Sequence, residues 1–251
     1  MMIRTDVEEL AINGEEESMT VRRVPRVVAL LTTQSDASPM ETGLKACANA
    51  MAERMGRDRT IVRLGVRDPD VPSVWLAQRN GMAPVDAVIE ATLKEGVDLE
   101  TFISGCRGLG HDLEGIADPS ASAILAGVAH LIVPGSAATF IALAGRRDPK
   151  ISVEDYRRWW LKQHAVLAQQ IIHPFAEGYE QLHVDRELSR RAAKAAGFAV
   201  EDYDAFDSIF YHSVADFLKG VTDPEVARQL YEDEVGHVDH ASMRAAVCRL
   251  L

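Results

Sequence analysis

The clearest pattern in the chain lies between Ile151 and Ile171, where apolar residues recur every three or four positions, as along one face of an α-helix. This face carries one titratable ring among large apolar side chains: Val153, Tyr156, Trp160, His164, Leu167 and Ile171. The opposite face is charged, with Glu154, Arg157, Arg158 and Lys162. The pattern therefore predicts an amphipathic helix that buries His164 beside aromatic rings.

The residues around this helix predict strands and two further helices. Alternating or apolar runs rich in β-forming residues predict strands at Ala138–Gly145, Gly178–Asp185, Phe206–His212 and Met243–Leu250. Amphipathic stretches predict short helices at Ser213–Lys219 and Asp223–Asp233. The resulting order of strand, helix, strand, strand, helix, strand is that of a ferredoxin-like βαββαβ unit.

The first half of the chain shows the same order of elements. Its predicted strands are Arg26–Thr33, Thr60–Val66, Ser73–Gln78 and Ala123–Val133, and its predicted helices are Met40–Met55, Pro84–Glu95 and an inserted Asp98–Leu113. The sequence thus predicts an α+β fold of tandem ferredoxin-like units: an acidic, solvated leader over residues 1–22, a first unit over 23–135 and a second over 136–251. Each unit has one bare apolar sheet face, so two units pack face to face, within one chain or between chains.

Composition narrows the class of protein. The formal net charge of −11 argues against nucleic acid as a partner, because phosphate binding needs a basic surface. No apolar run reaches the roughly 18–20 residues that a membrane span requires, and the acidic N-terminal segment lacks the apolar core of a secretory signal. Cys47, Cys106 and Cys248 form no close pair, which predicts buried thiols in a reducing cytoplasm.

The second half resembles the EthD family of the dimeric α+β barrel superfamily, over about residues 138–250. The matching segments are ALAGRRDPKISVEDYRRWWLKQHAVLA, GYEQLHV, FDSIFYHSVADF and YEDEVGHVDH. The family pattern corresponds here to Ser152, Glu154, Tyr156, Trp159 or Trp160, His164, Gly178, Tyr179 and Asp239. In the first half, the corresponding helix segment ACANAMAERMG presents no inward titratable group, which predicts a scaffold without chemistry. Proteins on this barrel include cyclases, decarboxylases, lactone isomerases, quinone-forming monooxygenases and haem enzymes, so the site must decide the reaction.

Four residues are the candidate catalytic groups. His164 is the expected general acid or base, with Tyr156 beside it as a hydrogen-bond donor, although a histidine here could also be a core residue bonded to a backbone carbonyl. His183 and His212 lie on the faces of two predicted strands that could line the same pocket, or could instead point to the barrel interface or to solvent.

Aromatic residues on the same elements are the expected substrate contacts. Strand alternation places Tyr179, Gln181, His183 and Asp185 on one face, and Phe206, Ser208, Phe210 and His212 on one face of the next strand. The predicted substrate-binding residues are Trp159, Trp160, Tyr179, Phe206, Phe210 and Tyr211.

The segment YEDEVGHVDH concentrates titratable groups near the end of the chain. His237 and Asp239 are secondary acid/base candidates there, and His237 with His240 has a spacing that could bind a metal ion but that is common by chance. We predict no metal and no cofactor, because the chain has no Rossmann, P-loop or Schiff-base motif.

The sequence predicts a cofactor-independent acid/base enzyme, a lyase or decarboxylase, acting on a small hydrophobic aromatic or polyketide-like substrate. Three alternatives stay open: an isomerase or cyclase, a haem- or oxygen-dependent oxidoreductase, and a non-catalytic aromatic-binding accessory protein. We further expect a cytoplasmic homodimer that binds neither nucleic acid nor membranes.

Overall fold

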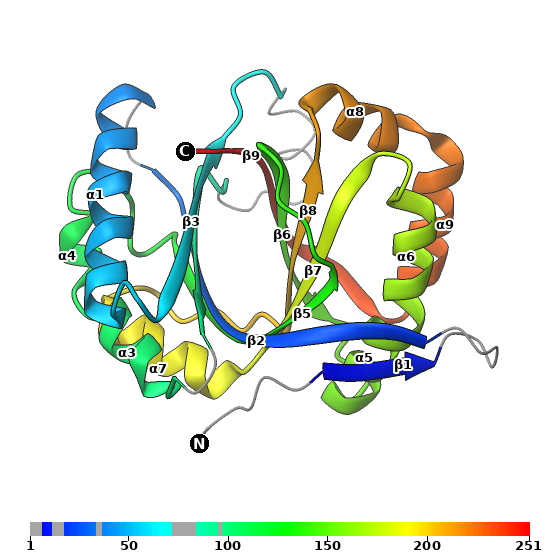
Figure 1. The fold of residues 1–251 in the computed structure, drawn as a ribbon, viewed down its shortest axis with the longest axis horizontal. Coiled ribbons are helices and arrows are strands. Elements are labelled where there is room, and N and C mark those ends of the chain that lie inside the picture. Colours follow the sequence, from blue (N-terminus) through cyan, green and yellow to red (C-terminus); the bar gives the residue numbers. More distant parts are fainter. Residues whose placement is uncertain (1–6, 12–17, 34–36, 72–83, 95–96) are drawn as a thin grey trace.

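A barrel of β-strands, closed within the single chain, forms the centre of the molecule in the computed structural model, which describes residues 7–11, 18–33, 37–71, 84–94 and 97–251 (Figure 1). The strands are β1 (Val7–Ala11), β2 (Ser18–Leu31), β3 (Thr60–Arg67), β4 (Ala87–Leu93), β5 (Ala123–Val133), β6 (Thr139–Arg147), β7 (Ala176–Val184), β8 (Ala205–Tyr211) and β9 (Val238–Leu250). Their order is β1-β2-β4-β3-β9-β6-β8-β7-β5, and β5 pairs with β2 to close the ring, leaving β1 outside it.

Helices cover the outside of this barrel in two layers (Figure 1). They are α1 (Ala37–Met55), α3 (Glu100–Cys106), α4 (Leu109–Asp112), α5 (Val153–Trp159), the π-helix η1 (Trp160–His164), α6 (Ala165–Ile172), α7 (Arg186–Ala196), α8 (Val214–Thr222) and α9 (Pro224–Glu234). The layer over the first half holds α1, α3, α4 and α7, and the layer over the second half holds α5, η1, α6, α8 and α9. None of the helices in the described segments is long and apolar enough to cross a membrane.

The strand order confirms the tandem ferredoxin-like units. In each unit the first strand lies between the third and the fourth, giving β5-β2-β4-β3 in the first half and β9-β6-β8-β7 in the second. The two units join along two seams, β3 with β9 and β5 with β7. Because one chain supplies both halves of the barrel, closure needs no second copy, and the homodimer stays a prediction.

Several predicted elements differ from those observed. The segment Pro84–Glu95, predicted as a helix, is strand β4, and six of its seven residues from Ala87 to Leu93 are buried. A strand covered on both faces shows no alternation, so its apolar run cannot be told from a buried helix. Part of the expected leader is also ordered as β1 and the start of β2. The strand predicted at Ser73–Gln78 lies outside the described residues.

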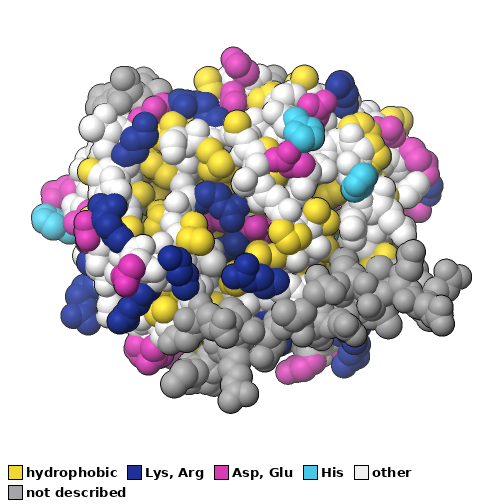
Figure 2. Space-filling model, in the orientation of Figure 1, with side chains coloured by type: hydrophobic (Ala, Val, Ile, Leu, Met, Phe, Trp, Pro, Cys, Tyr) yellow, Lys and Arg dark blue, Asp and Glu magenta, His cyan; other side chains and the backbone are white. Residues whose placement is uncertain are grey.

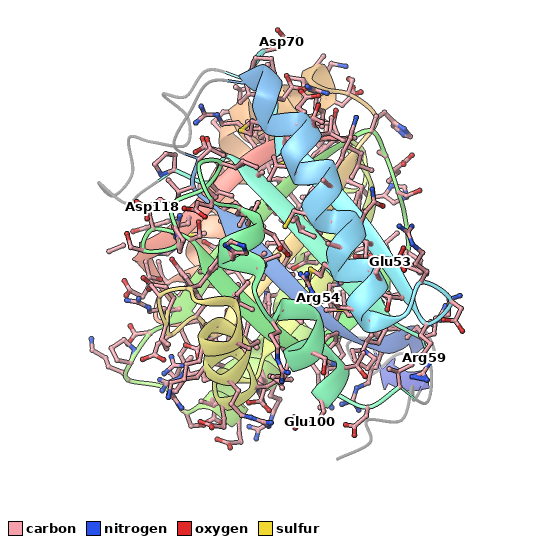
Figure 3. The ribbon with its side chains drawn as sticks, turned by 90° about the vertical axis from the view of Figure 1, so that its left-hand side faces the viewer. Glu53, Arg54, Arg59, Asp70, Glu100 and Asp118 are labelled. Atoms are coloured by element: carbon pink, nitrogen blue, oxygen red, sulfur yellow. The ribbon has the colours of Figure 1, made fainter. Side chains whose placement is uncertain are left out.

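Helix α7 was not predicted, and it packs away from its own unit. It follows β7 in the second half but contacts β5, α3 and α4 of the first. Leu188, Ala192 and Ala196 are buried in that half's core. Figure 3 shows the same layer from the side, where Arg54 of α1 donates to the carbonyl of Gly105 and to Asp112.

The interior of the barrel combines apolar packing with one buried ion network. Arg26 Nη1 lies 2.6 Å from Glu180 Oε2, and Arg63 Nη2 lies 2.9 Å from the same oxygen. Glu90 lies 3.5 Å from Arg26 and accepts a 2.7 Å hydrogen bond from Ser208 Oγ. These contacts tie the two halves together, because Glu180 and Ser208 belong to the second unit and the others to the first. Figure 2 shows charged side chains of both signs on the surface, with hydrophobic ones exposed between the helical layers.

One seam depends on the absence of a side chain. A Cβ atom on Gly127 of β5 would lie 2.1 Å from the backbone oxygen of His183 on β7, which cannot move without breaking the seam. We expect Gly127→Ala to lower the free energy of unfolding by about 1–3 kcal/mol, measured by urea denaturation. Gly145→Ala on β6 is the matched control, since its Cβ would meet only Met243 Cγ at 3.7 Å. Equal stability of the two variants would contradict this account.

Candidate functional site

A cavity of about 240 Å³ lies between the outer face of the second unit's strands and helices α6, α8 and α9. Most of its wall is apolar: Ile141, Leu143, Ala168, Ile172, Phe175, Ile209, Val221, Val226, Ala227, Leu230 and Met243. Its polar wall residues are His164, Tyr179, Asp207, Tyr211, Tyr231, Glu234 and His240. Tyr231 is 60% exposed, so the cavity meets solvent beside that residue. No lysine or arginine occurs among the described residues that line it.

The helix that carries His164 begins as predicted and then widens. Ser152 caps α5 by accepting a hydrogen bond from the backbone N–H of Asp155 at 3.0 Å. After Trp159 the chain forms a π-turn, in which the N–H of Ala165 donates to the carbonyl of Trp160, five residues earlier. The extra residue in this turn places the rings of Trp159 and His164 5.1 Å apart. Such π-turns occur frequently at functional sites.

His164 forms a dyad with Asp233 of α9. Its Nδ1 lies 2.7 Å from Asp233 Oδ2, and Trp159 Nε1 donates to the other carboxylate oxygen at 3.4 Å. This contact holds Nδ1 and leaves Nε2 as the ring nitrogen available to a ligand. Burial lowers the pKa of His164, but the hydrogen bond to Asp233 and the negative charges of Asp207 and Glu234 outweigh it, so the pKa is raised above its usual value.

Asp207 of β8 is a second acidic group in the wall of the cavity. Its side chain is half-buried, and its Oδ1 atom is buried and has no hydrogen-bond partner in the described part of the chain. Burial raises its pKa to about 7, and repulsion from Glu234 adds to the rise, while His164 and the Tyr179 hydroxyl partly offset it. A carboxyl group that titrates near neutral pH in an apolar cavity is typical of a functional site.

The aromatic residues of α5 and η1 form a wall beside His164. Tyr156, Trp159 and Trp160 line a smaller space of about 30 Å³ that His164 and Asp207 also border. The Tyr156 ring lies 5.6 Å from that of Trp160. Burial, followed by the charge of Asp207, raises the pKa of Tyr156 well above its usual value, so this phenol remains a hydrogen-bond donor. Tyr179 and Tyr211 line the main cavity.

Four of the predicted catalytic and substrate-binding residues lie elsewhere. His183 faces the helices but is separated from the cavity by Trp160, and the two rings stack with their centroids 4.8 Å apart. Burial lowers the pKa of His183 well below its usual value. His212 is exposed and lies 2.9 Å from Glu177. Phe206 and Phe210 point into the barrel interior, where they pack against residues of both halves.

The placement of Phe206 and Phe210 has a simple cause. Side chains alternate along a strand, so Asp207, Ile209 and Tyr211 face the helices while Phe206, Ser208 and Phe210 face the barrel interior. The prediction grouped the strand residues correctly but assigned the wrong group to the pocket.

The terminal segment contributes through residues other than those predicted. The two predicted acid/base candidates, His237 and Asp239, do not border the cavity. The ring of His237 stacks on that of Trp159 at 4.1 Å, and Asp239 accepts a hydrogen bond from the backbone N–H of Ala241. Asp233 and Glu234, which the sequence analysis included only within the segment of titratable groups, are at the site. His240, noted there as a possible metal ligand with His237, also lines the cavity. The described residues contain no group of three or more side chains able to hold a metal ion.

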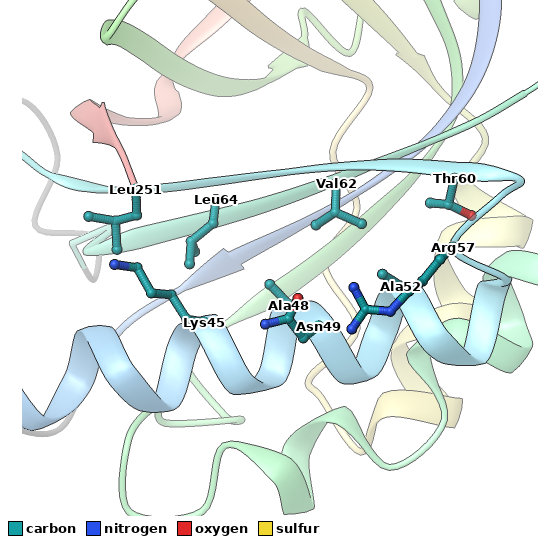
Figure 4. A pocket seen from close by; sticks show the side chains of 9 residues that line it. All are labelled: Lys45, Ala48, Asn49, Ala52, Arg57, Thr60, Val62, Leu64 and Leu251. Carbon is teal, nitrogen blue, oxygen red and sulfur yellow. The ribbon is translucent and has the colours of Figure 1, made fainter.

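A second cavity lies on the other side of the molecule, between α1 and β3 (Figure 4). It measures about 380 Å³ and is lined by Lys45, Ala48, Asn49, Ala52, Arg57, Thr60, Val62, Leu64 and Leu251. This wall has cations but no histidine or carboxylate side chain among the described residues, so it offers no acid/base pair. The chemistry of the described residues is therefore concentrated in the second half.

Two solved structures with TM-scores above 0.5 support the fold across nearly the whole chain. An anthrone oxidase-like protein matches with a TM-score of 0.54 at 10% identity, covering 91% of each chain. A candidate chlorite dismutase matches with a TM-score of 0.52 at 9% identity, covering 91% of this chain and 95% of the other. A haem-binding protein from Thermus thermophilus matches at 0.48 and 12% identity, covering 100% and 96%. No curated protein sequence matches the chain.

These neighbours correct the function predicted from the sequence. The main prediction was a cofactor-independent lyase or decarboxylase. The similar structures are described instead as oxidase-like and dismutase proteins, which are names of oxidoreductases. The prediction of a cofactor-independent lyase is therefore wrong, and the alternative of a haem- or oxygen-dependent oxidoreductase agrees better with the comparisons.

One family model matches the sequence itself. The EthD domain model covers residues 148–241, from the turn before α5 into β9. This segment includes His164, Asp207, Asp233 and Glu234, so the whole dyad and the neighbouring carboxyl groups fall within it. Residues 148–241 of this chain therefore match the EthD domain model, and the candidate site lies inside the matched segment.

Proposed function

We propose that the protein is an oxygen-dependent oxidoreductase that oxidises a small aromatic ketone with an acidic methylene group. The observation that carries the proposal is the His164–Asp233 dyad in the wall of an apolar cavity. A largely apolar cavity favours a flat hydrophobic substrate, and a histidine oriented by a carboxylate favours removal of a proton from it.

The dyad performs the proton transfer. Nε2 of His164 accepts a proton from an acidic O–H or C–H group of the substrate, while Asp233 holds Nδ1–H and stabilises the imidazolium that forms. Tyr156 remains protonated because burial raises its pKa, so its hydroxyl can donate to a developing oxyanion.

The oxidation step uses molecular oxygen as the oxidant. Deprotonation leaves an electron-rich carbanion, stabilised as the aromatic enolate, which gives up electrons to O₂. The substrate's methylene carbon loses two hydrogens and gains one oxygen atom as a ketone, and the second oxygen atom leaves with those hydrogens as water. The description of the anthrone oxidase-like neighbour supports an anthrone-type methylene ketone as the substrate class.

Haem does not fit the cavity. His164 has a suitable free nitrogen, and a metal-binding histidine does commonly donate its other ring N–H to a carboxylate. However, pockets for drug-sized ligands measure roughly 300–1,000 Å³, and haem is a large ligand, whereas this cavity measures about 240 Å³. Its described wall presents Asp207 and Glu234 and no lysine or arginine to neutralise the two propionates.

Oxygen uptake with anthrone as the probe tests the proposal. We expect protein-dependent consumption of one O₂ per quinone formed, above the rate of spontaneous oxidation in protein-free buffer, with no turnover under nitrogen. Quinone absorbance and an oxygen electrode give the two rates independently. Turnover of equal rate with and without oxygen would reject the proposal, and so would uptake no faster than in the protein-free control.

A further inference from the structure

We infer that Asp207 selects the substrate by charge: the cavity accepts neutral hydroxylated aromatic rings and rejects the same rings bearing a carboxylate. This inference rests on the proposed function in taking the cavity as the substrate site. It adds a specificity-determining residue and restricts the substrate class to uncharged compounds.

The position of Asp207 makes it available to a ligand. Its side chain borders both the main cavity and the smaller aromatic space next to His164. The Oδ1 atom is buried and has no partner among the described residues. A buried acceptor without a hydrogen bond destabilises the protein, and a ligand hydroxyl placed there would satisfy it. A ligand carboxylate has no proton to donate and would leave Oδ1 unsatisfied.

The charges facing Asp207 oppose an anionic ligand. Glu234 of α9 lies on the same cavity wall, and its charge contributes to the raised pKa of Asp207. The other titratable groups around Asp207 are His164 of η1, Tyr179 of β7 and Tyr156 of α5. The groups on this cavity wall that can carry a positive charge are His164 and His240. Nδ1 of His164 lies 2.7 Å from Asp233, and Nε2 of His240 lies 2.8 Å from Glu234. An anionic ligand would therefore meet Asp207 and two histidines that are each already paired with a carboxylate.

The test compares two ring systems of the same size. We would measure binding of 2-naphthol, which is neutral at pH 8, and 2-naphthoate, which is anionic, by calorimetry under nitrogen. We expect the wild-type protein to bind 2-naphthol at least about tenfold more tightly than 2-naphthoate. In Asp207→Asn the two affinities should differ by less than about threefold, because the amide carries no charge and can donate to a carboxylate.

Three variants control for other causes. Asp207→Glu keeps the charge and should keep most of the discrimination. Glu232→Gln changes an exposed carboxyl group on the same helix as Glu234, outside the cavity, and should match the wild type. Asp207→Ser also removes the charge and gives the same comparison if the asparagine variant does not fold.

The inference is overturned if the wild-type protein does not prefer 2-naphthol, or if the uncharged variants discriminate as strongly as the wild type. Its outcome is separate from that of the proposed function. Charge discrimination that depends on Asp207, without any oxygen uptake, would support this inference and reject the oxidoreductase. Oxygen uptake without discrimination between the two ligands would reject this inference and support the oxidoreductase.

Discussion

Replacing His164 by alanine is expected to reduce kcat/KM for the oxygen-dependent reaction by about 10²–10⁴-fold, the usual contribution of a positioned acid/base group. The reason is that Nε2 of His164 is the proposed proton acceptor, and Asp233 is placed to stabilise its charged form. The measurement is initial oxygen uptake with anthrone, together with circular dichroism to show that the variant is folded. His212→Ala is the matched control, because His212 is exposed and lies outside the cavity.

The pH profile separates the role of the base from a structural one. Since the pKa of His164 is raised, the neutral base forms only above the usual histidine pKa of 6.5, and wild-type activity should rise with pH through an inflection above that value. Asp233→Asn removes the hydrogen bond that raises the pKa, so the inflection should shift to lower pH while the plateau rate falls. Near-normal activity of His164→Ala, or equal losses in His164→Ala and His212→Ala, would reject the assignment.

Replacing Asp207 by asparagine is expected to stabilise the protein at pH 8 by up to about 4 kcal/mol relative to the wild type. The pKa of Asp207 is about 7 in the folded protein and 3.8 for the unperturbed group. Between these values the folded state binds more protons than the unfolded state, so wild-type stability falls as pH rises from about 4 to about 7. Below about pH 4 both states are protonated and the contribution disappears. The asparagine side chain does not titrate, so the stability of the variant does not fall between about pH 4 and pH 7 for this reason.

Urea denaturation of both proteins at several pH values between 4 and 8 measures the effect. The difference between the free energies of unfolding of variant and wild type should grow with pH and level off above about pH 7. Glu232→Gln removes an exposed carboxyl group and should show no comparable dependence on pH. A constant difference over the whole pH range would show that Asp207 has an ordinary pKa, which would also remove one support for its role in the cavity.

Local patterns in the sequence were enough for much of the fold. The Ser152 cap and the apolar stripe from Val153 to Ile171 determined a helix with His164 buried. The order of elements determined the second ferredoxin-like unit, and the apolar run at Ala123–Val133 determined β5 with its observed bounds. These features depend on residues close in sequence, whose spacing reveals helix or strand directly.

The tertiary structure decided the partners of His164. Asp233 lies 69 positions further along the chain and reaches His164 only because α9 packs beside α6. The π-turn at Trp160–His164 brings Trp159 beside the dyad, whereas the helical spacing favoured Trp160. Neither a long-range contact nor a local widening of a helix leaves a periodic signal in the sequence.

The tertiary structure also decided which face of β8 belongs to the site. The sequence by itself determined that Phe206 and Phe210 share one face and Asp207 and Tyr211 the other, because side chains alternate along a strand. It could not determine which face meets the helices. Both faces of a barrel strand are covered, one by the barrel interior and the other by helices. The pattern of hydrophobic residues therefore does not distinguish the face that meets the helices from the face that meets the interior. Only the packing of η1, α6 and α9 against the outer face of the second unit's strands places Asp207 in the cavity with His164.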